Sequence, residues 1–233
     1  SVGEVMAIGR RFDEALQKAV RMLEIGEDGL SSRRLADKSD HELEQYLIRP
    51  TPIRLFAIVE AMRRGMTVKK AHSLTGIDEW FLQAVRRVVE CEQEAEKIPL
   101  HTYTKEQMKA LKRIGVSDRR IATLTNTREL EVRKYRKMLG VTPCVFQIDT
   151  LAGEFPAKTN YLYMTYNGSH NDVEPLGRRG VALLGSGPYR IGSSVEFDWT
   201  CVQTALALKE YNRRSIIINC NPETVSTDYD MSE

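Results

Sequence analysis

Two short apolar runs near the end of the chain constrain its fold more than any other feature. VALLG, residues 181–185, and SIIIN, residues 215–219, are typical of strands that are buried on both faces. A glycine-rich loop and a partly apolar helix that runs to about Tyr211 separate them. A strand, a loop, a helix and a second strand form a βαβ unit, which belongs in a parallel sheet with helices on both faces. Because two parallel strands cannot hide both faces of a sheet, we expect this part to be an incomplete domain.

The loop between the first strand and the helix has an unusual glycine pattern. It reads GSGPYRIG and begins like the dinucleotide-binding pattern G-x-G-x-x-G, with Gly185 and Gly187 in the first two positions. The third position holds Arg190, and the next glycine is Gly192. The second strand ends in NCN, with no acid to hold a ribose, and no Walker lysine is present. The loop therefore argues against a nicotinamide cofactor, and a Rossmann-type nucleotide binder is kept as an alternative interpretation.

Residues 1 to about 140 carry the apolar spacing of helices. Phe12, Leu16 and Val20, for example, recur at intervals of four residues. Ser39 and Glu42 form a capping-box signal, and Thr51-Pro52 is a favourable helix start because proline at the first position loses no hydrogen bond. The predicted helices are one over about 12–23, one after Ser39, one from Thr51-Pro52 to Gly65, and others over 67–74, 78–96, 104–114, 117–124 and 128–139.

Two of the helical segments resemble each other. GMTVKKAHSLTGIDEWFLQAVRR begins at Gly65, and GVSDRRIATLTNTRELEVRKYRK begins at Gly115, fifty residues later. Each predicts a short helix, a turn and a longer helix. Repeated units of this kind usually pack against each other and share a core.

The second repeat also resembles a helix-turn-helix reader of DNA. Residues 105–137 contain eleven basic and four acidic residues. Phosphate binding needs a surplus of positive charge, however, and the formal net charge of the whole chain is only +2. A helix pair in an all-α domain is therefore the favoured interpretation, with nucleic-acid binding as the alternative.

The hydrophobic pattern changes after residue 140. Alternation over 145–149 and the segment YLYMTYNG, residues 161–168, indicate strands, the second followed by an Asn-Gly turn. The polar segment HNDVEPLGRRG, residues 170–180, contains proline and glycine and predicts a domain boundary.

Cysteine usage and hydropathy exclude several classes of protein. The four cysteines, at positions 91, 144, 201 and 220, form no CxxC pair, and the histidines are too sparse to complete a zinc site. We expect reduced, structural thiols in an intracellular protein, and no metal site. No run of about 18 apolar residues is available to span a membrane, and the start lacks a secretory leader. The first residue is Ser1 rather than Met, so we expect a segment cut from a larger protein.

Several longer strings resemble one known family. GSGPYRIGSSVEFDW and NPETVSTDYD, residues 185–199 and 221–230, resemble the opening of the second, carbamoyl-phosphate-forming half of the carbamoyl phosphate synthetase large subunit. SVGEVMAIGR, residues 1–10, resembles the close of the first half. DEWFL, residues 78–82, and AGEFPAKTNYLYMTY, residues 152–166, resemble the helical oligomerisation domain between the halves.

The resemblance implies a fold and a domain order. The expected fold is an α+β multidomain fragment, in which an all-α helical oligomerisation domain precedes an incomplete Rossmann-like (pre-ATP-grasp) α/β domain. Residues 1–24 would close the first synthetic half, 25–172 would form the oligomerisation domain, and 173–233 would open the second half. The segment 24–48 fits the family loosely, as a variable insertion would.

The resemblance also implies an activity for the full chain. The family makes carbamoyl phosphate from bicarbonate, two ATP and ammonia, usually from glutamine, for pyrimidine and arginine biosynthesis in the cytoplasm. ATP and Mg²⁺ (or Mn²⁺) would bind to ATP-grasp domains outside this segment, which would bind no cofactor and would be inactive alone. The implied partners are a glutamine amidotransferase subunit or domain and further copies of the chain through the helical domain, with no nucleic acid and no membrane.

Within the segment, the resemblance implies part of a tunnel for carbamate between the two active sites. Three glutamates of this path fall on Glu4, Glu196 and Glu223. Carbamate decomposes when it is protonated, so its path must be shielded and polar, and fixed carboxylates can order water without reacting. Arg190 would pair with such a carboxylate.

Structural interpretations of the same residues stand beside these. Glu196 completes a capping box with Ser193, Glu223 is able to cap the turn after it, and Glu4 suits a solvated helix position. The apolar face of the helix over 78–96, formed by Leu82, Val85, Val88 and Val89, fits packing within the domain or across a subunit interface, and the sequence does not separate the two.

Overall fold

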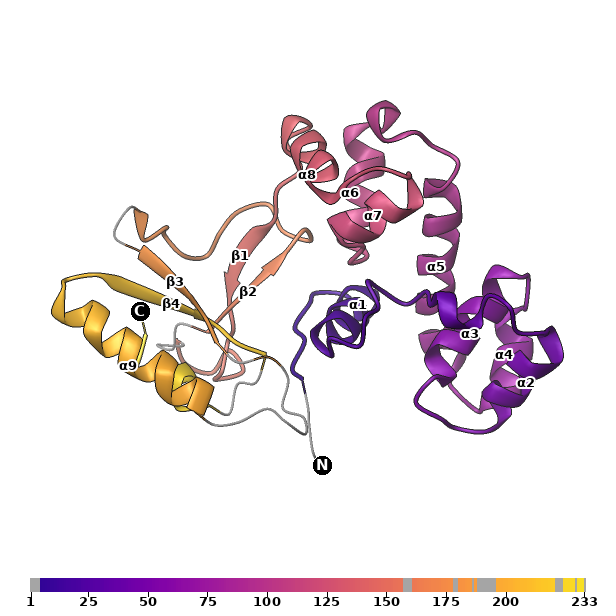
Figure 1. Cartoon of the computed structure of the whole chain (residues 1–233), viewed down its shortest axis with the longest axis horizontal. Helices are drawn as coiled ribbons and strands as arrows, with labels where there is room; N and C mark the ends of the chain where they lie inside the picture. Colours follow the sequence, from indigo (N-terminus) through magenta and orange to yellow (C-terminus); the bar gives the residue numbers. More distant parts are fainter. Residues whose placement is uncertain are drawn as a thin grey trace. The chain divides into compact units, whose positions relative to one another are not determined.

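A computed structural model describes residues 5–156, 161–177, 180–185, 187, 196–220, 224–228 and 230–232, without the side chains of Glu196 and Phe197. The chain forms two compact units (Figure 1). One consists of Arg10–Arg21 and Ile25–Thr142, and the other of Ser1–Gly9, Met22–Glu24 and Pro143–Glu233. The described elements are a mixture of α-helices and short strands, as expected from the sequence, and the predicted domain boundaries stay predictions.

The first unit is helical. Its helices are α1 (Phe12–Met22), α2 (Asp40–Ile48), α3 (Arg54–Arg63), α4 (Val68–Thr75), α5 (Glu79–Ala95), α6 (Lys105–Arg113), α7 (Asp118–Leu124) and α8 (Glu129–Met138), with 3₁₀ turns at Arg33–Leu35 and Leu100–Thr102. All the helices predicted for this region are confirmed.

One predicted helix start is wrong. The helix expected from Thr51-Pro52 begins only at Arg54, because residues 51–53 form a turn in which the Arg54 N–H donates to the Thr51 carbonyl at 3.0 Å. The capping box before α2 is confirmed. The Ser39 N–H donates to the Glu42 carboxylate at 2.9 Å, and the Ser39 hydroxyl accepts from the Glu42 N–H at 3.3 Å. The backbone hydrogen bond from Ser39, together with bonds from Lys38 and the Ser39 hydroxyl, lowers the pKa of Glu42 to about 2.

The sequence repeat is also a structural repeat. Helices α3, α4 and α5 recur fifty residues later as α6, α7 and α8. Gly65 and Gly115 end α3 and α6 with φ of +102° and +93°, a conformation that favours glycine. Thr67 and Ser117 then cap α4 and α7 by accepting a backbone hydrogen bond in the first helical turn.

The core of the helical unit answers a question that the sequence left open. Leu82, Val85, Val88 and Val89 of α5 are each at most 4% exposed. Helix α5 contacts α3, α4 and α7 of the same unit. This apolar face therefore packs within the domain, and any subunit interface must use other side chains.

A buried carboxylate joins the two repeats. Glu92 of α5 is 0% exposed and accepts two hydrogen bonds from Arg120 of α7, at 3.0 and 2.5 Å. The Ser31 hydroxyl donates to the same carboxylate at 2.8 Å, and Arg63 of α3 lies 3.7 Å from it. The charge is thereby compensated by one close and one more distant arginine.

Basic residues of the second repeat take part in similar pairs. Lys112 and Arg136 are mostly buried and both contact the Asp118 carboxylate, at 2.8 Å in each case. Burial lowers the pKa of Lys112 to about 8, although the Asp118 charge opposes this shift. With Arg120, three of the basic side chains that suggested DNA binding are used inside the domain.

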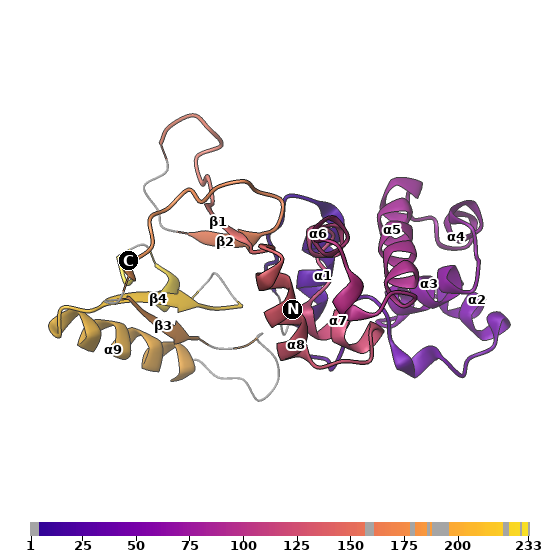
Figure 2. The ribbon, with the colours of Figure 1, turned by 90° about the horizontal axis from the view of Figure 1, so that it is seen from above.

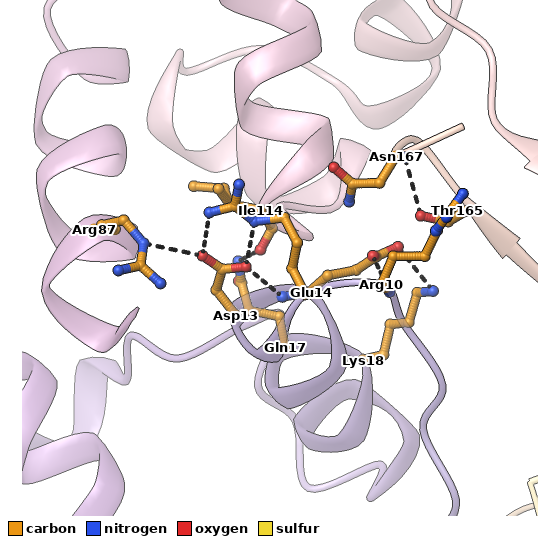
Figure 3. A network of polar contacts seen from close by, with 10 residues as sticks. Arg10, Asp13, Glu14, Gln17, Lys18, Arg87, Ile114, Thr165 and Asn167 are labelled. Atoms are coloured by element: carbon orange, nitrogen blue, oxygen red, sulfur yellow. Dashed lines mark hydrogen bonds and ion pairs between the residues drawn. The ribbon is translucent and has the colours of Figure 1, made fainter. Parts of the chain in front are cut away.

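Helix α1 packs on the end of α6 (Figure 3). Gln17 donates to the Ile114 carbonyl and Arg21 to the Gly115 carbonyl, both at 2.8 Å. A Cβ atom at Gly115 would lie 2.9 Å from Cα and 3.1 Å from the carbonyl oxygen of Glu14. The turn after α6 therefore approaches the backbone of α1 too closely at this position for any residue other than glycine.

Two pairs of strands lie in the described part of the second unit. Strands β1 (Cys144–Gln147) and β2 (Leu162–Thr165) are antiparallel, with Cys144 opposite Thr165. Strands β3 (Gly180–Leu184) and β4 (Arg214–Ile218) are parallel, with Leu184 opposite Ile218. Helix α9 (Glu196–Glu210) connects β3 to β4, so the predicted strand–helix–strand order and the parallel pairing are confirmed.

Only one face of the β3–β4 pair is covered among the described residues. Figure 2 shows α9 along that face, where Ser215 is 4% and Ala205 of the helix is 2% exposed. On the other face Leu184 and Ile218 are 80% and 56% exposed. This exposed face agrees with the expectation that two parallel strands and one helix are an incomplete domain, because the described residues supply a single helical layer.

The paired turns at Gly65 and Gly115 give a matched test of the packing of α1. Gly65→Ala meets no atom within 4 Å and should lower the free energy of unfolding only by the cost of a left-handed residue, about 1–2 kcal/mol. Gly115→Ala adds a clash with the Glu14 backbone and should cost about 3 kcal/mol or more. Urea unfolding of both variants measures the difference. Equal losses would contradict the close approach of α1.

The pair formed by Glu92 and Arg120 gives a second test. Glu92→Gln leaves two arginines facing an uncharged group in the interior and should lower the free energy of unfolding by about 3–5 kcal/mol. The control is Glu94→Gln, because the Glu94 side chain is 71% exposed and pairs only with Lys97 among the described contacts. That control should change stability by at most about 1 kcal/mol in denaturant unfolding. Similar values for the two variants would refute the buried pair.

Candidate functional site

Most of the site residues predicted from the sequence lie outside the described residues. This holds for Glu4, Arg190, Gly192 and Glu223. Glu196 is the first residue of α9, but its side chain is not described. The candidate site is therefore described through Gly185, Gly187 and the described residues next to the predicted glutamates in the sequence. These described residues lie around the carboxyl ends of β3 and β4.

Gly185 lies in close contact with the end of β4. Its N–H donates to the Ile218 carbonyl at 2.8 Å. A Cβ atom at this position would lie 3.0 Å from Cγ of Asn219 and 3.1 Å from the Ile218 carbonyl oxygen. The first glycine of the loop thus allows the chain to leave β3 directly against the end of β4.

Gly187 faces a carboxylate that sequence reasoning missed. A Cβ atom at Gly187 would lie 3.2–3.4 Å from the carboxylate of Glu24. Glu24 has φ of +52°, which is unusual for a residue other than glycine. The pKa of the Cys220 thiol, at the end of β4, is raised by burial and by the Glu24 charge. Glu24 belongs to the segment that fits the family loosely, so the sequence offered no signal for its position.

Asp198 is a second residue that sequence reasoning missed. It lies in the first turn of α9 and is 9% exposed. Its two carboxylate oxygens accept hydrogen bonds from the backbone N–H groups of Val225 and Ser226, at 2.9 and 3.2 Å. These donors begin the 3₁₀ turn Val225–Thr227, so the carboxylate caps a turn that is distant in sequence.

Side chains also hold the turn that follows β4. The Asn219 amide donates to the Thr224 hydroxyl at 2.9 Å, and the Thr227 hydroxyl donates to the Thr224 carbonyl at 2.7 Å. Thr224 is 3% and Ser226 0% exposed. This end of the sheet is thus a polar interior held by hydrogen bonds.

The amino-terminal segment reaches the same strand end. The Met6 N–H donates to the Cys220 carbonyl at 3.4 Å. Met6, Asp198 and Val225 each follow one of the predicted glutamates by two residues in the sequence. The structure therefore brings together the described neighbours of all three glutamates at the carboxyl end of β4, which is where open parallel sheets usually bind ligands.

The described residues offer neither a metal site nor a membrane-spanning helix. No group of His, Cys, Asp and Glu side chains there is arranged to hold a metal ion. Within the same residues, no helix has the length and apolar character needed to cross a membrane. The four cysteines form no disulfide.

The helical unit carries an exposed aromatic cluster, formed by Phe12, Trp80 and Phe81. The ring centroids lie 5.0–5.6 Å apart. Trp80 is 60% and Phe81 43% exposed. Clustered exposed aromatic side chains are typical of protein–protein contacts.

Two family models match the chain in sequence order. The model of the carbamoyl-phosphate synthetase large chain, oligomerisation domain, matches residues 4–140. The model of the carbamoyl phosphate synthase preATP-grasp domain matches residues 177–233.

Curated relatives match the whole chain. It is 47% identical to the carbamoyl phosphate synthase large chain of Nostoc sp., with 100% of this chain and 21% of the relative covered. It is 47% identical to the multifunctional protein pyr1-3 of Dictyostelium discoideum, covering 99% of this chain and 10% of the relative. It is 41% identical to the mitochondrial carbamoyl-phosphate synthase [ammonia] of Rattus norvegicus, covering 99% and 16%. The chain thus spans only 10–21% of the length of these three relatives.

Proposed function

Because the chain belongs to the carbamoyl phosphate synthase large-chain family, we propose that it joins the two ATP-dependent halves of such a synthase. The full protein would be a ligase that makes carbamoyl phosphate from bicarbonate, two ATP and ammonia, for pyrimidine and arginine biosynthesis. The observation that carries this proposal is the match of both family models, in order, across one chain with 41–47% identity to curated relatives.

The segment has a linking role in this proposal. ATP and Mg²⁺ (or Mn²⁺) would bind in ATP-grasp domains, and neither matching family model is an ATP-grasp domain. A glutamine amidotransferase subunit or domain would supply ammonia. The parallel pair β3–β4 with α9 would open a Rossmann-like domain of the second half. The chain's location in the cytoplasm stays a prediction.

Residues of the second unit would line part of the carbamate path. Glu4, Glu196 and Glu223 would provide carboxylates along it. Support comes from Met6, Asp198 and Val225, which lie two residues from these glutamates and are held around the end of β4. Buried polar groups that are already hydrogen-bonded to one another suit a shielded path, because they need no bulk water to satisfy them.

The helical unit would mediate self-association. With the apolar face of α5 buried inside the domain, the aromatic cluster of Phe12, Trp80 and Phe81 is the surface best suited to contact a second copy. The oligomerisation-domain match over residues 4–140 includes this cluster.

The proposed path can be tested by measuring how closely ATP hydrolysis is coupled to carbamoyl phosphate formation. In the full-length protein, Glu196→Ala or Glu223→Ala should keep bicarbonate-dependent ATP hydrolysis by the first half but lower carbamoyl phosphate formation, because carbamate escapes or decomposes. The measurement is the ratio of ATP hydrolysed to carbamoyl phosphate formed. Glu210→Gln, an exposed residue at the last turn of α9, is the control and should keep the wild-type ratio. An unchanged ratio in both alanine variants would contradict the proposed role of Glu196 and Glu223 in the carbamate path.

Self-association is tested at the aromatic cluster. Trp80→Ala combined with Phe81→Ala should weaken subunit association by at least about tenfold, because aromatic side chains dominate interface energies. Sedimentation of the full-length protein over a concentration series measures this. Leu130→Ala on α8, where the side chain is 77% exposed, is the matched control and should leave association unchanged. Equal effects of the two variants would place the interface elsewhere.

A further inference from the structure

The carboxylate of Asp198 makes an unusual long-range contact at the candidate site. It is 9% exposed, and both of its oxygens accept backbone hydrogen bonds, from Val225 at 2.9 Å and Ser226 at 3.2 Å. Val225 and Ser226 follow Asp198 by 27 and 28 positions in the sequence. Hydrogen bonds to a charged acceptor are stronger than neutral ones, so this carboxylate fixes the turn firmly against the first turn of α9.

The turn also has local contacts. Thr224 accepts from Asn219, five residues before it, and from the Thr227 hydroxyl. These contacts shape the turn and tie it to the end of β4. Among the hydrogen bonds found in the described residues, those of Asp198 are the ones that connect the turn to α9.

The sequence gives this connection a functional meaning. Asp198 follows Glu196 by two residues, and Val225 follows Glu223 by two residues. We propose that Asp198 is a positioning residue, whose carboxylate sets the spacing between the chain segments that carry Glu196 and Glu223. This inference rests on the proposed function, in which both glutamates line the carbamate path. Without these two hydrogen bonds, the turn would be held less firmly against α9, and carbamate would be lost between the two active sites.

The contact between Asp198 and the turn can be broken by changing either the acceptor, Asp198, or a donor, Val225. Asp198→Asn keeps the size of the side chain but leaves one oxygen to serve two donors. Val225→Pro removes one donor and leaves Asp198 unchanged. Proline suits this position because Val225 begins the 3₁₀ turn and Thr224 before it is extended, with φ of −109° and ψ of 145°. Val225→Ala keeps the N–H and is the matched control, because the Val225 side chain is 55% exposed.

The experiment uses the full-length protein and measures three quantities. These are carbamoyl phosphate formation, bicarbonate-dependent ATP hydrolysis, and the hydrogen-exchange rates of the Val225 and Ser226 amides. We expect Asp198→Asn and Val225→Pro to raise the ATP hydrolysed per carbamoyl phosphate by about tenfold, as the loss of a hydrogen bond to a charged group suggests. Bicarbonate-dependent ATP hydrolysis should stay near the wild-type rate. The Ser226 amide should exchange faster in both variants, and Val225→Ala should match the wild type in all three measurements.

The double variant adds an independent check. If the two substitutions break one contact, Asp198→Asn with Val225→Pro should raise the ratio less than the product of the single effects. A purely structural role would instead lower both activities together in proportion to the loss of folded protein. Such a parallel loss, or a wild-type ratio in both single variants, overturns the inference while the proposed function stands. A wild-type full-length protein that makes no carbamoyl phosphate overturns both.

Discussion

The helical unit depends on a charge that is buried without access to water. Glu92 has no exposed surface, and an isolated carboxylate in that position would be strongly destabilising. Arg120, Ser31 and the more distant Arg63 compensate it, and they come from α7, the segment before α2, and α3. The two repeats and the segment before α2 must therefore take one relative arrangement for the charge to be satisfied.

The repeats end their first helices alike but use the resulting carbonyl groups differently. After α3, Arg86 donates to the carbonyls of Met62 and Met66. After α6, Lys112 donates to the carbonyl of Val116, the position equivalent to Met66, and the carbonyls of Ile114 and Gly115 accept from Gln17 and Arg21 of α1. A cation at a helix carboxyl end is favourable, so Arg21 stabilises this arrangement. The two repeats are thus asymmetric, and the second repeat binds α1.

The second unit holds a group of polar contacts at the carboxyl end of β4. The Met6 N–H, the Asp198 carboxylate and the Asn219 amide all bond there to the backbone or side chains of residues 220–226. Several of these groups are almost fully buried, yet they are paired. A path for an acid-labile intermediate needs this combination of polarity and shielding, which a purely apolar wall or an open surface does not provide.

The sequence alone determined the helices, the parallel strand pair and the family, because caps, glycine turns and apolar spacing act over a few residues. The capping box at Ser39 and the left-handed turns at Gly65 and Gly115 are of this kind. Only the tertiary structure decided that the apolar face of α5 is internal, which face of β3–β4 is covered by α9, and that Asp198 binds the turn after β4. Those outcomes depend on partners that are tens of residues away, and local sequence patterns carry no information on which partner a side chain meets.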